Sequence, residues 1–87
     1  MKLKYIFESV DMGDEIILVP VGEGANHVQG ILKMNKEGLE IVKLLKTEIS
    51  ENQIVDLLSK KYVNDKETLL EYVHTVIKEL TQAGVLE

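Results

Sequence analysis

The chain contains no cysteine, only one proline and no block of basic residues. Without cysteine, disulfides, thiolate zinc sites and cysteine nucleophiles are excluded, so the stability of the fold has to come from packing. Its 87 residues, 45% of them hydrophobic, are enough for one small core and predict a single domain over residues 1–87. A run of membrane-spanning length is also missing, and Glu8 and Asp11 interrupt the apolar stretch that follows Lys2 and Lys4. These features predict a cytoplasmic protein with no membrane partner.

The net charge is −5, and both parts of the chain are mildly acidic. Residues 1–34 hold three lysines against five acidic residues, and residues 35–87 hold seven lysines against ten. Proteins that bind nucleic acids gain much of their affinity by neutralising phosphates. The charge distribution therefore predicts no nucleic-acid partner.

The residues that commonly carry catalysis are sparse and scattered. His27 and His74 are the only histidines, and neither has a second ligand at metal-binding spacing. The serines have no nucleophile signature, and the glycines from Gly22 to Gly30 are followed by no Lys-Ser or Lys-Thr of a phosphate-binding loop. The sequence predicts a protein that is not an enzyme and that holds no metal or cofactor.

The first part of the chain, residues 4–34, has the composition of β-strands. Residues 5–10 and 15–21 are rich in aromatic and β-branched side chains and flank a Gly13-Asp14 turn, and residues 28–34 predict a third strand. The short connections favour an antiparallel meander. Residues 16–19 are apolar without alternation, so either both faces of this strand are covered or one face awaits a partner or a second copy.

The second part predicts three amphipathic helices at about 36–46, 51–62 and 65–82. Asn35 is a good N-cap for the first, and Ser50 with Gln53 has the spacing of a capping box for the second. The third carries an apolar stripe at helical spacing, formed by Leu69, Val73, Val76 and Leu80. Strands followed by three helices predict an α+β fold, a three-stranded antiparallel sheet and a three-helix bundle of the winged helix-turn-helix type.

The apolar surface of the third helix extends beyond its core stripe along one flank. If this flank borders the third strand, the two form a groove in which an extended peptide can be added to the strand edge. The alternative is that Leu70 and Ile77 simply contact the second helix. The candidate peptide-binding residues are Val28, Gln29, Gly30, Ile31, Leu32 and Lys33 on the strand and Leu70, His74, Ile77 and Thr81 on the helix.

Four segments resemble the PqqD-like family, named after a coenzyme PQQ synthesis protein. Residues 30–38 are similar to its G-x-x-x-L-N-x-x-G segment, and residues 54–62 to its I-x-x-L-x-x-x-Y segment. Residues 71–80 and 83–86 are similar to its closing segment, which ends G-L-L. The sequence departs from the family pattern at Met34, Glu71 and Val76, where leucine, aspartate and an aromatic residue are usual. The last difference implies a looser groove.

The resemblance implies a precursor-peptide recognition element for ribosomally made, modified peptides. Such a module holds the leader peptide as an added strand between the third strand and the third helix, and brings it to a modifying enzyme, often a radical-SAM protein. PQQ is one of several products that the resemblance allows. Two other readings remain open, a winged-helix regulator that binds DNA and a small homodimer that uses the apolar sheet.

Overall fold

The computed structural model of the chain describes residues 1–22, 24, 32–63 and 65–87. Its elements follow in the order β1 (Ile6–Asp11), β2 (Ile16–Val21), β3 (Leu32–Met34), α1 (Lys36–Leu44), α2 (Glu51–Ser59) and α3 (Lys66–Gln82). The strands form one antiparallel sheet in the order β1-β2-β3. The predicted α+β class, three antiparallel strands followed by three helices, is confirmed.

The described residues cover the inner face of the sheet more fully than its outer face. Ile16 and Leu18 of β2 are 4% and 1% exposed, whereas Val19 of the same strand is 37% exposed. Side chains of a strand alternate between the two faces, so Ile16 and Leu18 point towards the helices and Val19 points to the outer face. On the outer face of β2, Ile17 and Val21 are half-buried and Val19 is exposed, so the described residues cover this face only in part.

The helices begin where capping side chains predict. Ser50 and Gln53 form a complete capping box at α2, and Asn35 accepts a hydrogen bond from the Gly38 N–H at α1. α1 and α2 end at Leu44 and Ser59, before the predicted ends at 46 and 62. In both cases the chain leaves the helix through a tighter turn with i→i−3 hydrogen bonds, which apolar periodicity does not reveal.

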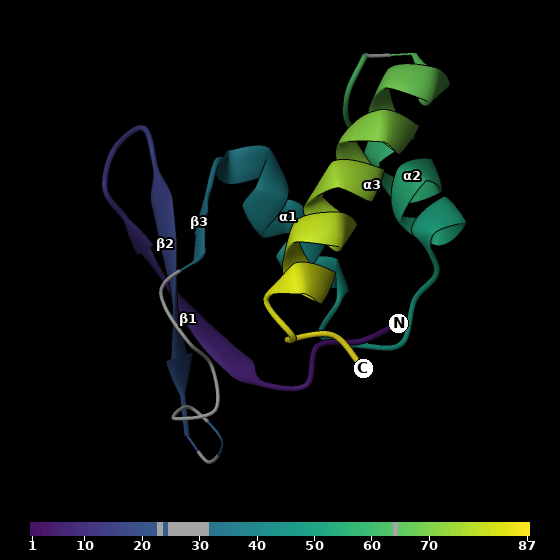
Figure 1. Cartoon of the computed structure of the whole chain (residues 1–87). Helices are drawn as coiled ribbons and strands as arrows, with labels where there is room; N and C mark the ends of the chain where they lie inside the picture. The colour runs from purple at the N-terminus through teal and green to yellow at the C-terminus, as the bar shows by residue number, and fades with distance from the viewer. Residues whose placement is uncertain (23, 25–31, 64) are drawn as a thin grey trace.

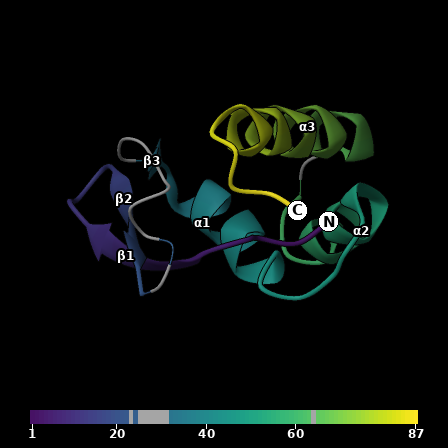
Figure 2. The ribbon, with the colours of Figure 1, turned by 60° about the horizontal axis from the view of Figure 1, so that its bottom comes forward.

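The sheet lies at one end of the molecule beside α1, and α3 packs along α2 (Figures 1 and 2). The two chain ends meet: Leu3 pairs with Leu86, and the Lys4 N–H donates to the Val85 carbonyl at 2.8 Å. Gly84 has a φ of +74°, the left-handed conformation that ends α3 and turns the chain back, so that Val85 is fully buried. The core consists of Leu3, Leu18, Ile41, Val42, Leu45, Ile54, Val55, Leu58, Leu69, Val73, Val76, Leu80 and Val85.

Candidate functional site

β3 is an edge strand whose second edge is open. Across the described residues it pairs with β2 alone, through Ile16↔Met34, Ile17↔Lys33 and Leu18↔Leu32. A strand edge carries unpaired N–H and C=O groups and is a template for another extended chain. The open edge of β3 is therefore the first component of the site.

The register decides which residue of β3 offers its peptide groups to this edge. The Met12 N–H donates to the Glu15 carbonyl at 2.8 Å, so these residues form a hydrogen-bonded pair of the β1–β2 ladder. Hydrogen-bonded and non-hydrogen-bonded pairs alternate along an antiparallel ladder, and this ladder has no bulge. Counting from the turn, the peptide groups of Ile17 point towards β1 and those of Ile16 and Leu18 point towards β3.

It follows that Leu32 and Met34, which face Leu18 and Ile16, use their peptide groups to pair with β2. Lys33 lies between them, so its N–H and C=O point the other way, out of the sheet edge. Its side chain is exposed on the outer face. Lys33 is thus the described residue best placed to bond an added strand through its main chain.

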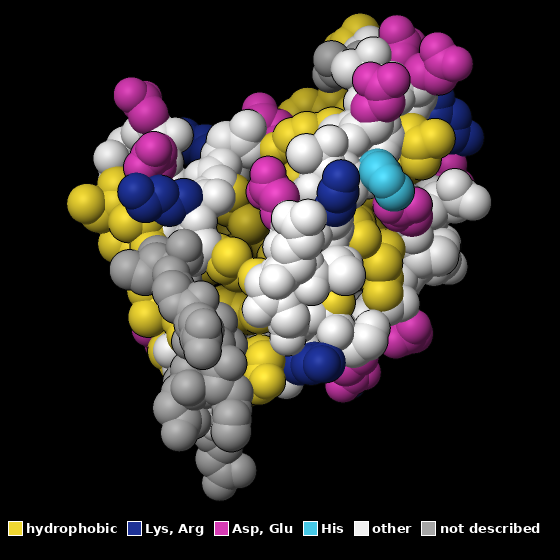
Figure 3. All heavy atoms as spheres, in the orientation of Figure 1, with side chains coloured by type: hydrophobic (Ala, Val, Ile, Leu, Met, Phe, Trp, Pro, Cys, Tyr) yellow, Lys and Arg dark blue, Asp and Glu magenta, His cyan; other side chains and the backbone are white. Residues whose placement is uncertain are grey.

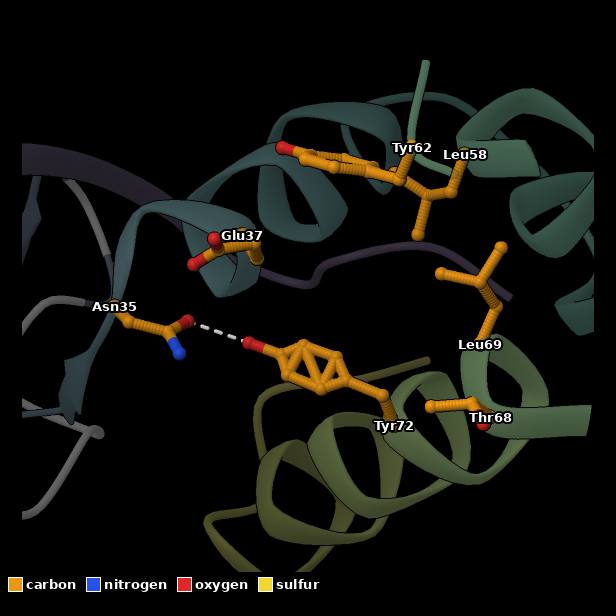
Figure 4. A pocket seen from close by; sticks show the side chains of 7 residues that line it. All are labelled: Asn35, Glu37, Leu58, Tyr62, Thr68, Leu69 and Tyr72. Carbon is orange, nitrogen blue, oxygen red and sulfur yellow. Dashed lines mark hydrogen bonds between the residues drawn. The ribbon is translucent and has the colours of Figure 1, made fainter. Parts of the chain in front are cut away.

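The end of β3 is joined to α3 by one side-chain contact. Asn35 follows β3 directly, and its Oδ1 accepts from the Gly38 N–H at 2.9 Å and from the Tyr72 hydroxyl (Figure 4). Gly38 allows this approach, because a Cβ there would lie 3.0 Å from the Met34 Cβ. The contact ties α3 to the point where β3 ends and α1 begins.

Tyr72 is a stable donor in this contact. Burial raises the pKa of its hydroxyl, the hydrogen bond to Asn35 opposes this shift, and the charge of Glu37 adds to it. A raised pKa keeps the hydroxyl protonated through the neutral range. The link between α3 and Asn35 is therefore insensitive to pH near neutrality.

A hollow lined with hydrophobic side chains lies between the sheet and α3 (Figure 3). Leu32 and Met34 lie on the inner side of β3, and both are half-buried against the core. Tyr72 packs against the same core from α3. The arrangement offers main-chain bonding on one side and apolar contacts on the other, as strand addition requires.

The structure separates the residues that the sequence predicts for this site. Val28, Gln29, Gly30 and Ile31 lie outside the described residues, as does His27. Leu32 and Lys33 lie on β3 as expected, one half-buried and the other exposed. Thr81 is exposed near the end of α3 and donates to the Ile77 carbonyl, and Ile77 is half-buried against the core.

The predicted flank of α3 is turned towards α2 at two of its residues. His74 Nδ1 lies 3.1 Å from Glu51 Oε1 at the start of α2, and Leu70 lines a surface depression with Asn52 and Val55 of the same helix. The hypothesis that this flank borders the third strand is therefore wrong for Leu70 and His74, which lie beside α2. Any role of these residues in peptide binding stays a prediction.

Sequence reasoning missed Tyr72 as the residue of α3 that reaches β3. Tyr72 lies on the other side of the Leu69–Val76 stripe, so the helical periodicity that widened the opposite flank pointed away from it. Its one sequence signal is an aromatic residue with a polar tip next to the stripe, a type that needs a hydrogen-bond partner when it is buried. The partner is Asn35, whose role as the N-cap of α1 already accounts for its side-chain oxygen, so the sequence gives no sign of a second hydrogen bond.

Among the described residues, no group of three His, Asp or Glu side chains is placed to hold a metal ion. Nor does any helix in the described parts of the chain have the length and apolarity to cross a membrane.

Replacing Asn35 with alanine is expected to lower the free energy of unfolding by about 1–2 kcal/mol, because the cap of α1 is lost and the Tyr72 hydroxyl loses its acceptor. Urea unfolding measures this change. Asn35→Asp is the matched control, since it keeps an acceptor oxygen and places a negative charge at a helix start. An equal loss of stability in both variants would contradict the role of the Asn35 Oδ1 as a hydrogen-bond acceptor.

The fold and the open edge define a winged-helix-like module with a site for an extended segment between a strand and a helix. The chain belongs to the PqqD family: the family model described as coenzyme PQQ synthesis protein D matches residues 15–86. A solved structure of TbiB1 in complex with the TbiA(beta) leader peptide has the same fold, with a TM-score of 0.72 and 23% sequence identity. The match covers 100% of this chain and 95% of that chain. No curated protein matches the sequence significantly.

Proposed function

We propose that this protein is a non-catalytic recognition module that captures the leader segment of a ribosomally made precursor peptide by strand addition to β3. The observation that carries this function is the open edge of β3, where the Lys33 N–H and C=O point away from the sheet, two residues before the Asn35 that Tyr72 of α3 bonds. Family membership supports it. So does the likeness to TbiB1, which is described in complex with a leader peptide.

The captured peptide is presented to a modifying enzyme, and a radical-SAM enzyme is the class that we propose for it. The whole chain, residues 1–87, acts as one recognition domain. Because a precursor peptide is made by ribosomes, we place this step in the cytoplasm. PQQ synthesis and the synthesis of another modified peptide are both compatible with this role.

A titration of isotope-labelled protein with the short peptide encoded beside its gene tests this function. We expect NMR shifts concentrated at residues 32–34 and around Asn35 and Tyr72, because an added strand contacts the open edge and the adjoining helix. The affinity should change little with salt, whereas binding to phosphates weakens steeply. Absence of shifts at millimolar peptide would contradict the proposal.

One observation favours a second function, self-association through the sheet. The outer face of β1 and β2 carries Ile6, Val10 and Val19, which are 70%, 44% and 37% exposed. The register places Ile6 opposite Val21 and Val10 opposite Ile17, so these apolar side chains share one face. A sedimentation mass of twice 9.8 kDa, reduced to one chain by Val19→Glu, would favour a homodimer.

The structure supports the function of a DNA-binding regulator less well than that of a peptide-binding module. Asp65 caps α3 and Glu67 lies in its first turn, so the end of the helix that would meet a phosphate backbone is acidic. Asp65 accepts a hydrogen bond from the Thr68 N–H, which lowers the pKa of its carboxyl and keeps it charged. This charge opposes the approach of phosphate.

A further inference from the structure

A cavity of about 290 Å³ lies next to the end of β3, between the three helices. Figure 4 shows its arrangement: Tyr62 and Tyr72 lie on opposite sides of it, the ring of Tyr62 seen edge-on and that of Tyr72 nearly face-on, and Leu58 and Leu69 lie at one end. Glu37 lies at the other end, near the two hydroxyl groups. Pockets for whole small molecules are commonly roughly 300–1,000 Å³, so this volume suits one side chain of a larger ligand.

The charge of the cavity has one sign. Glu37 is the only charged side chain that lines it, and among the described residues Glu37 takes part in no ion pair. Neither lysine nor arginine lines the cavity. The nearby Glu40 is already engaged by Lys61 at 2.6 Å, so Glu37 is the carboxylate available to a ligand.

The two tyrosine hydroxyls respond to this negative charge. Burial is the main cause that raises the pKa of each, and the carboxylates of Glu40 and Glu37 raise the pKa of Tyr62 further. Glu37 also raises the pKa of Tyr72. Lys61 opposes this effect at Tyr62. The negative charge beside the space between the rings is that of Glu37, which attracts cations.

We propose that this cavity receives a lysine or arginine side chain of the bound peptide. The cation pairs with Glu37 at the end of the cavity that adjoins Asn35 and contacts the Tyr62 and Tyr72 side chains, and Leu58 and Leu69 close the far end. The aromatic rings and the carboxylate act together, because each attracts a cation. The net charge of −5 favours a basic partner as well.

The cavity adjoins the open edge of β3 through Asn35. This residue directly follows β3 and accepts a hydrogen bond from the Tyr72 hydroxyl. A peptide that is added beside Lys33 therefore passes close to it. The role of the cavity in peptide selection rests on the proposed function, but its preference for a cation does not. The two are tested separately.

The preference for a cation is tested with N-acetylarginine methylamide as the probe, followed by NMR of the ring signals of Tyr62 and Tyr72. We expect shifts with this probe, none with the neutral citrulline analogue, and loss of the shifts in Glu37→Gln. Glu71→Gln is the control, since it removes the same charge from an exposed position of α3 outside the cavity. Equal shifts with citrulline, or equal loss in both variants, would overturn the proposal.

The role in peptide selection is tested with a random-peptide display library selected on the whole protein. Wild-type protein should enrich peptides with lysine or arginine at one fixed position, and Glu37→Gln should weaken their binding by about two- to fivefold, as for loss of an ion pair with an exposed carboxylate. Enrichment of apolar residues at that position would overturn it. If no peptide is enriched while the arginine probe still binds, the proposed function fails and the cation site stands.

Discussion

Replacing Lys33 with proline should weaken binding of the leader peptide by about tenfold or more while leaving the domain folded. Proline removes the N–H that points out of the open edge and places a ring where an added strand has to approach. Loss of one main-chain hydrogen bond weakens binding by about 0.5–1.5 kcal/mol, and the ring adds to this. Calorimetric titration of the peptide measures the change.

Lys33→Ala is the matched control for this variant. Alanine keeps the main-chain N–H and removes only an exposed side chain, so the affinity should stay within about twofold. The assignment of the edge also predicts that Lys33→Pro retains the wild-type NMR signals of Asn35 and Tyr72. If proline at this position unfolds the sheet instead, the N–H of Lys33 points towards β2 and the register argument is wrong.

Replacing Leu18 with alanine should destabilise the domain by about 2–5 kcal/mol. Leu18 is 1% exposed and lies in the core cluster as the sheet's most deeply buried residue, so the shortened side chain leaves a cavity between β2 and the helices. A domain of this length is stable by roughly 4–13 kcal/mol, at ~0.05–0.15 kcal/mol per residue. The substitution therefore removes a large part of the total, which urea unfolding followed by circular dichroism measures.

Val19→Ala is the comparison for this experiment. Val19 is the next residue of the same strand but points to the outer face and is 37% exposed. Val19→Ala should lower the free energy of unfolding by no more than about 1 kcal/mol, mostly because alanine has a lower strand propensity than valine. A similar loss in both variants would mean that the outer face is covered as tightly as the inner one, and would favour a second copy bound there.

The elements and their order follow from local signals in the sequence. Local chemistry sets where each helix begins, because Asn35 and Ser50 accept N–H groups of the first turn a few residues away. The end of α3 follows in the same way from Gly84, which takes the left-handed conformation without strain. The four-residue stripe of α3, from Leu69 to Leu80, is buried as its periodicity predicts.

Tertiary structure alone decided which neighbour each surface meets. Periodicity tells which residues share a face of α3 but not which element lies against that face, so Leu70 and His74 were expected beside β3 and lie towards α2. The contact that joins α3 to the strand, Tyr72 with Asn35, spans 37 residues of sequence and has no local signal. The direction of the Lys33 peptide groups likewise follows only from the register, because one step along an antiparallel ladder reverses it.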